Sequence, residues 1–247
     1  MRIEICVDSI EGALAAERGG ADRIELCDNL FEGGTTPSAG CIKLTRSAMR
    51  IGLQVMIRPR GGDFVYSDPE FSIMREDITI ARELGADGVV LGCLTPEGDV
   101  DLPRTRALIE VSRPMNVTFH RAFDMCREPR VALQDLVRLE VDRVLTSGQE
   151  ANCLEGLELI ADLQREAAGR IMVMAGGGIT PRNLGMVVDA TGVPEVHLAA
   201  QASIESRMTF RNPRCFMGAA LRSSEFSRMT TDESTVRAAV SEFQDRK

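Results

Sequence analysis

The sequence lacks the features that would tie it to nucleic acid or to a membrane. Its 247 residues carry a formal net charge of −8, and the basic residues form no run. Because binding to a phosphate backbone relies on clustered Lys and Arg, we expect no nucleic-acid partner. No apolar stretch approaches the ~20 residues that span a bilayer, and no signal peptide precedes the first expected strand, so we expect no membrane partner.

Cysteine spacing gives no sign of a disulfide scaffold. The seven cysteines are an odd number, and none of them forms a C-x-x-C pair. Reduced thiols in a cytosolic protein are the simplest interpretation, so we expect a cytoplasmic location. The hydrophobic content of 44% and charged content of 27% are typical of a soluble globular protein with one sizeable core.

A recurring helix-to-strand junction indicates the architecture. It occurs at residues 18–26, 83–91 and 138–146, where a helical pattern closes on Gly or its substitute, an Asp makes the turn and an alternating apolar strand begins. The strand patterns are eight, at residues 2–7, 23–27, 53–58, 87–92, 116–120, 142–146, 171–175 and 194–197. Helical patterns separate them at about 12–24, 38–49, 70–84, 102–112, 129–139, 152–167 and 181–190.

This alternation predicts an α/β fold, a (β/α)8 TIM-type barrel, as one domain over residues 1–247. A doubly wound open sheet is the alternative, but all the strands are short and no G-x-G-x-x-G follows the first one. The barrel should occupy about residues 1–198. A polar, Arg-rich stretch without a clear period follows at 199–229, and a last amphipathic helix at about 232–245 has Thr231 or Asp232 as its N-cap.

The same phrase occurs in the first two expected strands. Residues 2–6 read R-I-E-I-C and residues 23–27 read R-I-E-L-C, separated by an Ala-rich helix candidate at 10–18 with Gly19-Gly20 as its stop. Adjacent parallel strands lie ~4.8 Å apart, so Cys6 and Cys27 in matching register favour linear coordination of Cu(I), a soft ion. The alternative is that both are buried as small apolar residues, the usual state of a buried cysteine.

Charged residues gather at the carboxyl ends of the strands, which form the working face of such a barrel. Alternation points Glu25, Cys27, Met56, Arg58, Thr118, His120 and His197 inward. A bidentate pair between Glu25 and Arg58 and an acid–base role for His120 then follow. The alternative is that Glu25, Arg58 and His120 only satisfy one another as a buried network. The run Gly176-Gly177-Gly178, before Thr180-Pro181 at a helix start, predicts either an anion cradle or a turn that needs positive φ.

At these residues the chain resembles the CutC family of copper homeostasis proteins, over nearly its whole length. The matching phrases lie at residues 6–9, 19–27, 32–38, 56–64, 118–125, 144–148, 174–178 and 207–212. The resemblance implies a cytoplasmic (β/α)8 barrel, a homo-oligomer, and binding of Cu(I) with Cys6 and Cys27 as its ligands. One departure is Ala199, where the family pattern commonly has a Ser, which puts a hydroxyl role there in doubt.

Two functions of different classes remain open. The first is cytoplasmic copper homeostasis, with Cu(I) held by Cys6 and Cys27. The second is a TIM-barrel enzyme acting on a small anionic or phosphorylated substrate, because the densest family matches surround residues that Cu(I) does not prefer as ligands. For that enzyme the catalytic candidates are Glu25, His120 and Asp124. The substrate-binding candidates are Arg58, Arg60, Asp63, Arg121, Ser147, Gly176, Gly177, Gly178 and His197.

Overall fold

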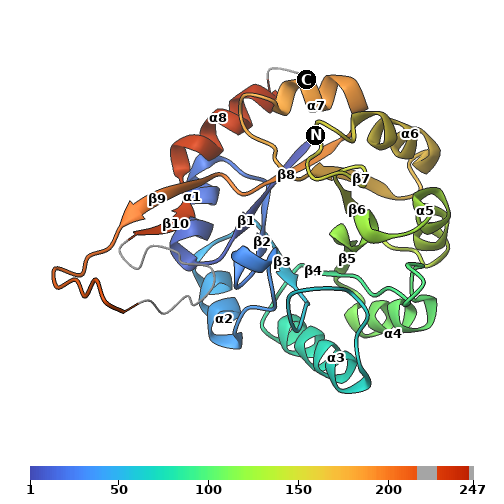
Figure 1. The fold of residues 1–247 in the computed structure, drawn as a ribbon, viewed down its shortest axis with the longest axis horizontal. Helices are drawn as coiled ribbons and strands as arrows, with labels where there is room; N and C mark the ends of the chain where they lie inside the picture. The colour runs from blue at the N-terminus through green and yellow to red at the C-terminus, as the bar shows by residue number, and fades with distance from the viewer. Residues whose placement is uncertain (216–226, 245–247) are drawn as a thin grey trace.

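Eight parallel strands close into a barrel in the computed structural model, which describes residues 1–215 and 227–244 (Figure 1). Each strand pairs with the next along the chain and β8 pairs with β1, so the barrel prediction is confirmed and the open sheet is wrong. The strands are β1 (Arg2–Val7), β2 (Arg23–Leu26), β3 (Gly52–Met56), β4 (Gly88–Leu91), β5 (Asn116–Phe119), β6 (Arg143–Thr146), β7 (Met172–Gly176) and β8 (Glu195–Leu198).

Helices form the outer ring. They are α1 (Ile10–Gly19), α2 (Ala39–Ala48), α3 (Asp68–Glu83), α4 (Leu102–Ser112), α5 (Pro129–Arg138), α6 (Leu157–Ala167), α7 (Leu184–Thr191) and α8 (Glu233–Gln244), with short 3-10 turns η1 (Leu30–Glu32) and η2 (Arg121–Met125). The first helix ends at Gly19 with Gly20 at a φ of 92°, so the glycine stop is confirmed and the expected extension to residue 24 is wrong.

Alternation along each strand separates two environments. The outward side chains, such as Ile3, Ile5 and Ile24, belong to the main core, which includes residues of the surrounding helices. Inside the barrel, Cys6, Cys27, Met56 and Val90 form a separate apolar cluster. The predicted inward direction of the strand-end residues is therefore confirmed. The barrel interior is packed with both apolar and polar side chains.

The two repeated phrases are not in matching register. In the ladder between β1 and β2, Cys6 lies opposite Glu25, and Val7 lies opposite Leu26. Cys27 therefore stands two residues beyond the position opposite Cys6, and the expectation of equal height is wrong. Because side chains alternate with a period of two, this shift keeps both thiols on the inner face.

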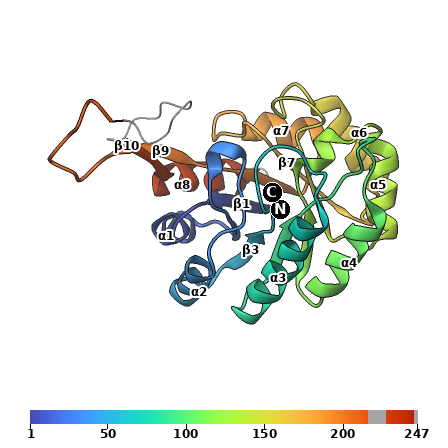
Figure 2. The ribbon, with the colours of Figure 1, turned by 60° about the horizontal axis from the view of Figure 1, so that its bottom comes forward.

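The C-terminal extension contains more regular structure than its sequence predicts. Strands β9 (Gln201–Glu205) and β10 (Ser227–Thr231) pair antiparallel and project from the barrel beside α1 and α8 (Figure 2). The expectation of an irregular segment over 199–229 is thus wrong at its ends, while 216–226 lies outside the described residues. Helix α8 packs between α1 and α7 as the eighth helix of the ring, and Asp232 accepts a hydrogen bond from the Thr235 N–H at 2.8 Å, as expected of its N-cap (Figure 1).

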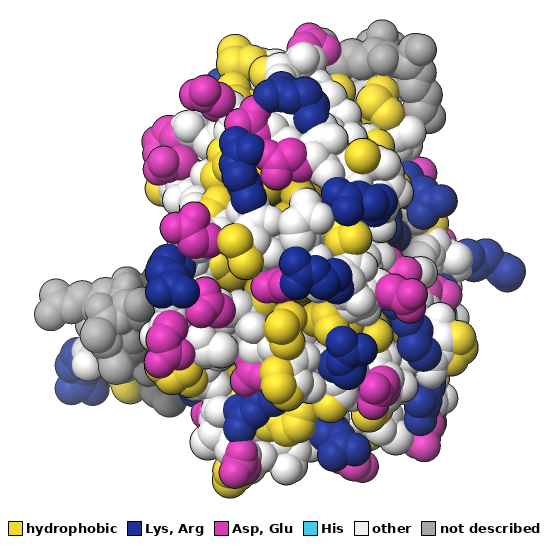
Figure 3. Space-filling model, turned by 90° about the vertical axis from the view of Figure 1, so that its right-hand side faces the viewer, with side chains coloured by type: hydrophobic (Ala, Val, Ile, Leu, Met, Phe, Trp, Pro, Cys, Tyr) yellow, Lys and Arg dark blue, Asp and Glu magenta, His cyan; other side chains and the backbone are white. Residues whose placement is uncertain are grey.

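The outer face over α5 carries side chains of both signs, interspersed rather than sorted (Figure 3). Arg130 on α5, for example, lies 2.7 Å from Asp162 on α6. Such a mixed face offers no basic stripe for a phosphate backbone. In the described part of the chain, the helices are too short or too polar to cross a membrane.

Candidate functional site

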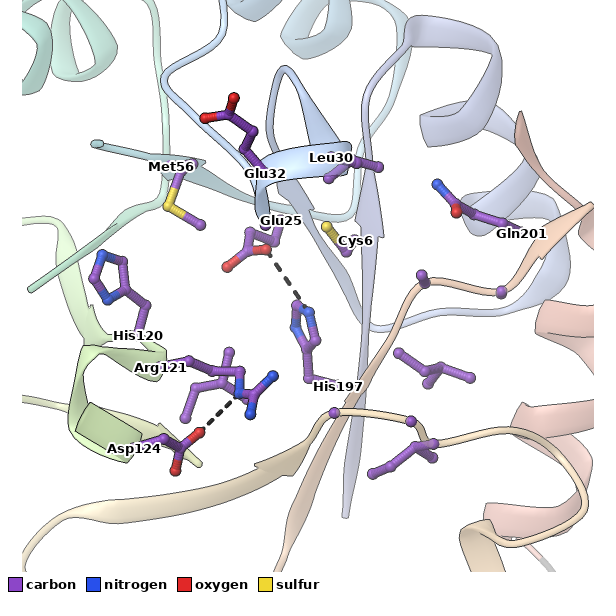
Figure 4. A pocket seen from close by; sticks show the side chains of 18 of the residues that line it. Cys6, Glu25, Leu30, Glu32, Met56, His120, Arg121, Asp124, His197 and Gln201 are labelled. Carbon is purple, nitrogen blue, oxygen red and sulfur yellow. Dashed lines mark hydrogen bonds and ion pairs between the residues drawn. The ribbon is translucent and has the colours of Figure 1, made fainter. Parts of the chain in front are cut away.

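A cavity of about 670 Å³ opens at the carboxyl ends of the strands (Figure 4). Polar groups from β1, β2, β3, β5 and β8 reach into it, among apolar side chains such as Leu30, Met56 and Phe64. The predicted site residues that line it are Cys6, Glu25, Arg58, His120, Arg121, Asp124, Gly177, Gly178 and His197. The strand ends therefore converge as the barrel topology requires.

Cys6 and Cys27 form a thiol pair on the cavity floor. Their Sγ atoms lie 3.8 Å apart, and Cys27 Sγ lies 3.3 Å from Glu25 Oε2. One atom from each of these three residues falls within 4.8 Å of the others, a spacing that a single metal ion can bridge. Both thiols are buried, and Cys6 lines the cavity whereas Cys27 does not.

His197 connects two carboxylates beside this pair. Its Nδ1 lies 2.8 Å from Glu4 Oε1, and its Nε2 lies 3.7 Å from Glu25 Oε2. Figure 4 shows the imidazole edge and the Glu25 carboxylate facing each other across the cavity floor. Glu4 therefore orients the ring and directs Nε2 toward Glu25, which is the arrangement of an acid–base relay.

Burial, hydrogen bonds and neighbouring charges shift the pKa values of these residues in different directions. The hydrogen bond with Cys27 lowers the pKa of Cys6 to about 5, against burial, and correspondingly raises that of Cys27. Burial raises the pKa of Glu25 well above its ordinary value. Burial alone would lower the pKa of His197, but the charges of Glu25 and Glu4 and the hydrogen bonds with Cys6 and Glu4 raise it. The lowered pKa of Cys6 favours its thiolate, the metal-binding form of cysteine.

A buried ion network supports the floor from below. Arg23 Nε donates to Glu4 Oε2 at 2.5 Å, and Arg23 Nη2 donates to Glu195 Oε2 at 2.5 Å. Arg143 Nε also donates to that Glu195 oxygen at 2.5 Å. Burial raises the pKa of Glu4, but Arg23 and His197 outweigh it and hold that pKa at about 2. Because Arg23 pairs with both Glu4 and Glu195, the Glu4 carboxylate that contacts His197 is fixed in position.

Arg58 is buried, with 5% of its surface exposed, yet it binds no carboxylate among residues 1–215 and 227–244. Its Nη1 donates to the carbonyls of Glu32 at 2.6 Å and Gly34 at 2.8 Å, and its Nη2 donates to that of Gly62 at 2.9 Å. Its Cζ lies 5.2 Å from the centre of the Phe64 ring. The guanidinium thus fastens two loops over the barrel mouth.

The predicted bidentate pair between Arg58 and Glu25 is wrong. Glu25 instead contacts His197 and Cys27, and no ion pair to Arg58 occurs among the described residues. The alternative of a mutually satisfied network of Glu25, Arg58 and His120 is also wrong. Within residues 1–215 and 227–244, Glu25 Oε1, Arg58 Nε and His120 Nε2 are buried without a hydrogen-bond partner.

His120 is held as a neutral donor. Its Nδ1 accepts a hydrogen bond from the Ala122 N–H at 3.1 Å, so the ring proton sits on Nε2. Burial, and then the charge of Arg58, lowers its pKa to about 3. Gly92 makes room for the ring, because a Cβ there would lie 2.7 Å from His120 Cε1. This environment suits hydrogen bonding to a ligand better than proton exchange near neutral pH.

Asp124 positions Arg121 on the opposite wall. Its Oδ2 accepts from Arg121 Nε at 2.7 Å and from the Ser147 hydroxyl at 3.0 Å, and its Oδ1 accepts from the Thr146 hydroxyl at 2.5 Å. Ser147 itself does not line the cavity, and its Oγ accepts from Arg121 Nη2 at 2.6 Å. Because both oxygen atoms of the Asp124 carboxylate already accept hydrogen bonds, Asp124 suits a positioning role better than the acid–base role expected of it.

Five other predicted residues divide between the cavity and its surroundings. Gly177 and Gly178 line it with φ of 98° and 75°, which confirms the turn that needs positive φ. Gly176 lies behind them, where a Cβ would meet Leu145 at 2.6 Å. Arg60 and Asp63 lie outside the cavity lining and pair with each other at 3.2 Å, so the structure does not bring these two predicted substrate-binding residues into the cavity.

A model of the CutC family matches residues 1–202 of this sequence, including every residue that lines the floor. The chain belongs to the CutC family. The match covers the whole barrel and ends within β9, so the rest of the extension with α8 lies beyond it.

Members of the CutC family with similar sequences come from distant organisms. The human copper homeostasis protein cutC homolog is 52% identical over 235 residues, covering 95% of this chain and 86% of the relative. A CutC family protein from Parabacteroides distasonis is 46% identical over 239 residues, covering 96% of this chain and 98% of the relative. The crystal structure of the putative copper homeostasis protein CutC from Streptococcus agalactiae superposes with a TM-score of 0.77 at 37% identity, covering 80% of this chain and 98% of that chain.

Sequence reasoning missed the ion network under the CutC cavity. Arg23 and Glu195 stand two residues before Glu25 and His197, which were predicted to point inward, and Glu4 stands two residues before the predicted ligand Cys6. The period-two alternation that found the upper layer therefore places the lower one as well. The signal for this network was a charged residue in the interior of each of these strands, where the structure shows the side chains to be buried.

Proposed function

We propose that this chain binds Cu(I) between Cys6 and Cys27 and takes part in cytoplasmic copper homeostasis. The observation that carries the proposal is the thiol pair, with its Sγ atoms 3.8 Å apart and with Cys6 lining an open cavity. Cu(I) is a soft ion that prefers thiolate and thioether ligands, and a two-thiol site suits its low coordination number.

The surroundings of the pair fit such an ion. Cys6 and Cys27 pack against Met56 and Val90, so the site has an apolar wall. Glu25 adds an oxygen atom within 4.8 Å of both sulfur atoms, but a hard carboxylate contributes little to Cu(I). Cys6 lines the cavity, which gives the ion a path to the pair, since Cys27 Sγ lies 3.8 Å from Cys6 Sγ. The names of the human and streptococcal relatives, which refer to copper homeostasis, support the proposal.

A competitive titration with a coloured Cu(I) chelator tests this proposal under anaerobic conditions. In the double variant Cys6→Ser/Cys27→Ser, affinity should fall by more than about 100-fold, beyond the 10–100-fold typical of losing a supporting residue. The control Cys41→Ser/Cys215→Ser removes two thiols outside the cavity, and Glu25→Gln removes the nearby carboxylate. Both should bind Cu(I) nearly as the parent does. Equal affinity in the parent and the Cys6/Cys27 double variant would contradict the proposal.

A second candidate function is an enzyme that acts on a small anionic or phosphorylated substrate. The relay of Glu4, His197 and Glu25 favours it, because a metal held by two thiols needs no oriented imidazole facing a buried carboxyl group. In this function Glu25 or His197 exchanges a proton with a substrate in the cavity.

Deuterium exchange tests the second candidate. The protein is incubated in D2O with a panel of small 2-oxo and 2-hydroxy acids, and NMR follows exchange of their carbon-bound hydrogens. The parent and the surface control Glu97→Gln should exchange at least one panel member, while Glu25→Gln should not. Absence of catalysed exchange across the panel would count against an acid–base enzyme of this class.

The homo-oligomer implied by the family resemblance remains a prediction.

A further inference from the structure

The cavity is far larger than a thiol-bound ion requires. Its volume of about 670 Å³ falls within the roughly 300–1,000 Å³ typical of pockets for small organic molecules. The Cu(I) proposal uses only the floor, at Cys6 and Cys27. The wall formed by Arg58, Phe64 and His120 has no part in it.

That wall carries a buried positive charge that the described residues do not pair with a carboxylate. Arg58 is a permanent cation, it is buried, and it donates to three neutral carbonyl groups. A buried charge without a counter-ion is costly. Arg121, on the opposite wall, is already paired with Asp124 at 2.7 Å. Glu25 and Glu32 also line the cavity, but neither carboxylate pairs with the Arg58 guanidinium in the described residues, so the anionic group of a ligand would supply that contact.

Two further groups in the lining lack partners. His120 Nε2, on a ring that is 3% exposed, is a donor without an acceptor, and Glu25 Oε1 is also unpaired among the described residues. Phe64 lies between Arg58 and His120, 5.2 Å from the Arg58 Cζ and 5.0 Å from the His120 ring centre. Figure 4 shows His120 and Glu25 on neighbouring parts of the wall. Buried polar groups are normally satisfied, so these atoms point to a missing ligand.

We propose that the cavity binds a small organic carboxylate, with its anionic group against Arg58 and His120 and a hydroxyl or amino group toward Glu25. A carboxylate carries one charge, which matches the single guanidinium of Arg58, whereas a phosphate monoester brings ≈ −1.5 to −2 at neutral pH beside the carboxylates of Glu25 and Glu32 in the same lining. The apolar side chains of Met56 and Phe64 accommodate the carbon skeleton. The inference is independent of copper, and it deepens the second candidate function, on whose cavity it rests, by naming the ligand class.

Thermal shift and calorimetry test the binding directly on the full chain, held metal-free by a Cu(I) chelator. The probes are lactate and benzoate, with lactamide and benzamide as neutral controls, inorganic phosphate as the competing anion, and chloride at equal ionic strength. At least one carboxylate should raise Tm in a saturable manner. Its neutral amide should not, and phosphate should bind at least about tenfold more weakly, a difference of about 1.4 kcal/mol.

Variants locate the site. Arg58→Met and His120→Gln should each weaken carboxylate binding at least tenfold. Arg46→Met is the matched control, because Arg46 also donates to two backbone carbonyls but lies at the other end of the barrel. If Arg58→Met does not fold, Arg58→Lys replaces it and should weaken binding less than His120→Gln does.

The outcomes separate this inference from both candidate functions. Cys6→Ser/Cys27→Ser should keep carboxylate binding even though Cu(I) is lost. Carboxylate binding without deuterium exchange would refute the enzyme and leave the binding site standing. Absence of any saturable carboxylate shift, or a shift unchanged in both Arg58→Met and His120→Gln, would overturn the inference.

Discussion

His120 should make stability fall steeply with acid, and the substitution His120→Gln should remove that part of the pH dependence. Burial and Arg58 hold the pKa of His120 at about 3 in the folded chain, against ~6.5 in an unfolded one. A depressed histidine pKa means that only the unfolded state takes up the proton between these values. The contribution is therefore fully present above pH ~6.5 and is lost as pH falls toward 3.

The magnitude follows from linkage. Each pH unit in this window changes the free energy of unfolding by ~1.4 kcal/mol per proton, so lowering pH from 8 to 5 should cost the parent about 2 kcal/mol through His120. Denaturant unfolding at pH 8, 6.5 and 5 measures it. The loss for the parent should exceed that for His120→Gln by this amount, since shifts at other groups are common to both proteins.

NMR gives a direct check, because the chain has only two histidines. With carbon-labelled histidine, the His120 signal, assigned through His120→Gln, should keep its neutral position down to pH ~4.5. A signal from His120 that titrates near 6.5, or equal acid sensitivity of parent and variant, would refute the account of this residue. The neutral donor role assigned to it would fall as well.

Three further predictions concern stability, each measured as a change in the free energy of unfolding. Arg23→Met should cost about 3–5 kcal/mol because it removes the buried guanidinium that pairs with both Glu4 and Glu195, whereas the exposed Arg130→Met should cost less than about 1 kcal/mol. Gly92→Ala should cost about 1–3 kcal/mol and shift the His120 signal, since the new Cβ would lie 2.7 Å from that ring; an unshifted signal would contradict the packing. Asp232→Ala should cost about 1 kcal/mol through loss of the α8 cap, and no loss would show that the cap is dispensable.

The strand pattern made the barrel predictable because alternation is a local property of sequence. The same alternation placed Glu25, His120 and His197 in one mouth, since the strands of a barrel end together. It did not give the height of one strand against the next. Matching positions in a repeated phrase determine which face a side chain occupies, whereas the stagger of a closed barrel sets its height. Cys6 therefore lies opposite Glu25 rather than opposite Cys27.

The hydrogen-bond partners of Arg58 could not be predicted from the sequence, for a different reason. Its three acceptors are backbone carbonyls of the loops at residues 32–34 and 62, and every residue type offers such a group. Opposite charge pointed to Glu25, but loop geometry decided the outcome. The same limit applies to Arg60, whose predicted ligand role depended on charge alone and which pairs with Glu70 at 2.7 Å instead.

X-ray absorption at the copper edge tests the central claim most directly. The protein is loaded with one equivalent of Cu(I), and the measurement reports the atoms bound to the ion. Sulfur ligands in the parent, and their loss in Cys6→Ser/Cys27→Ser but not in Cys41→Ser/Cys215→Ser, are the predicted result. An unchanged sulfur signal in the Cys6/Cys27 variant would show that Cu(I) binds elsewhere and would contradict the assignment of the thiol pair.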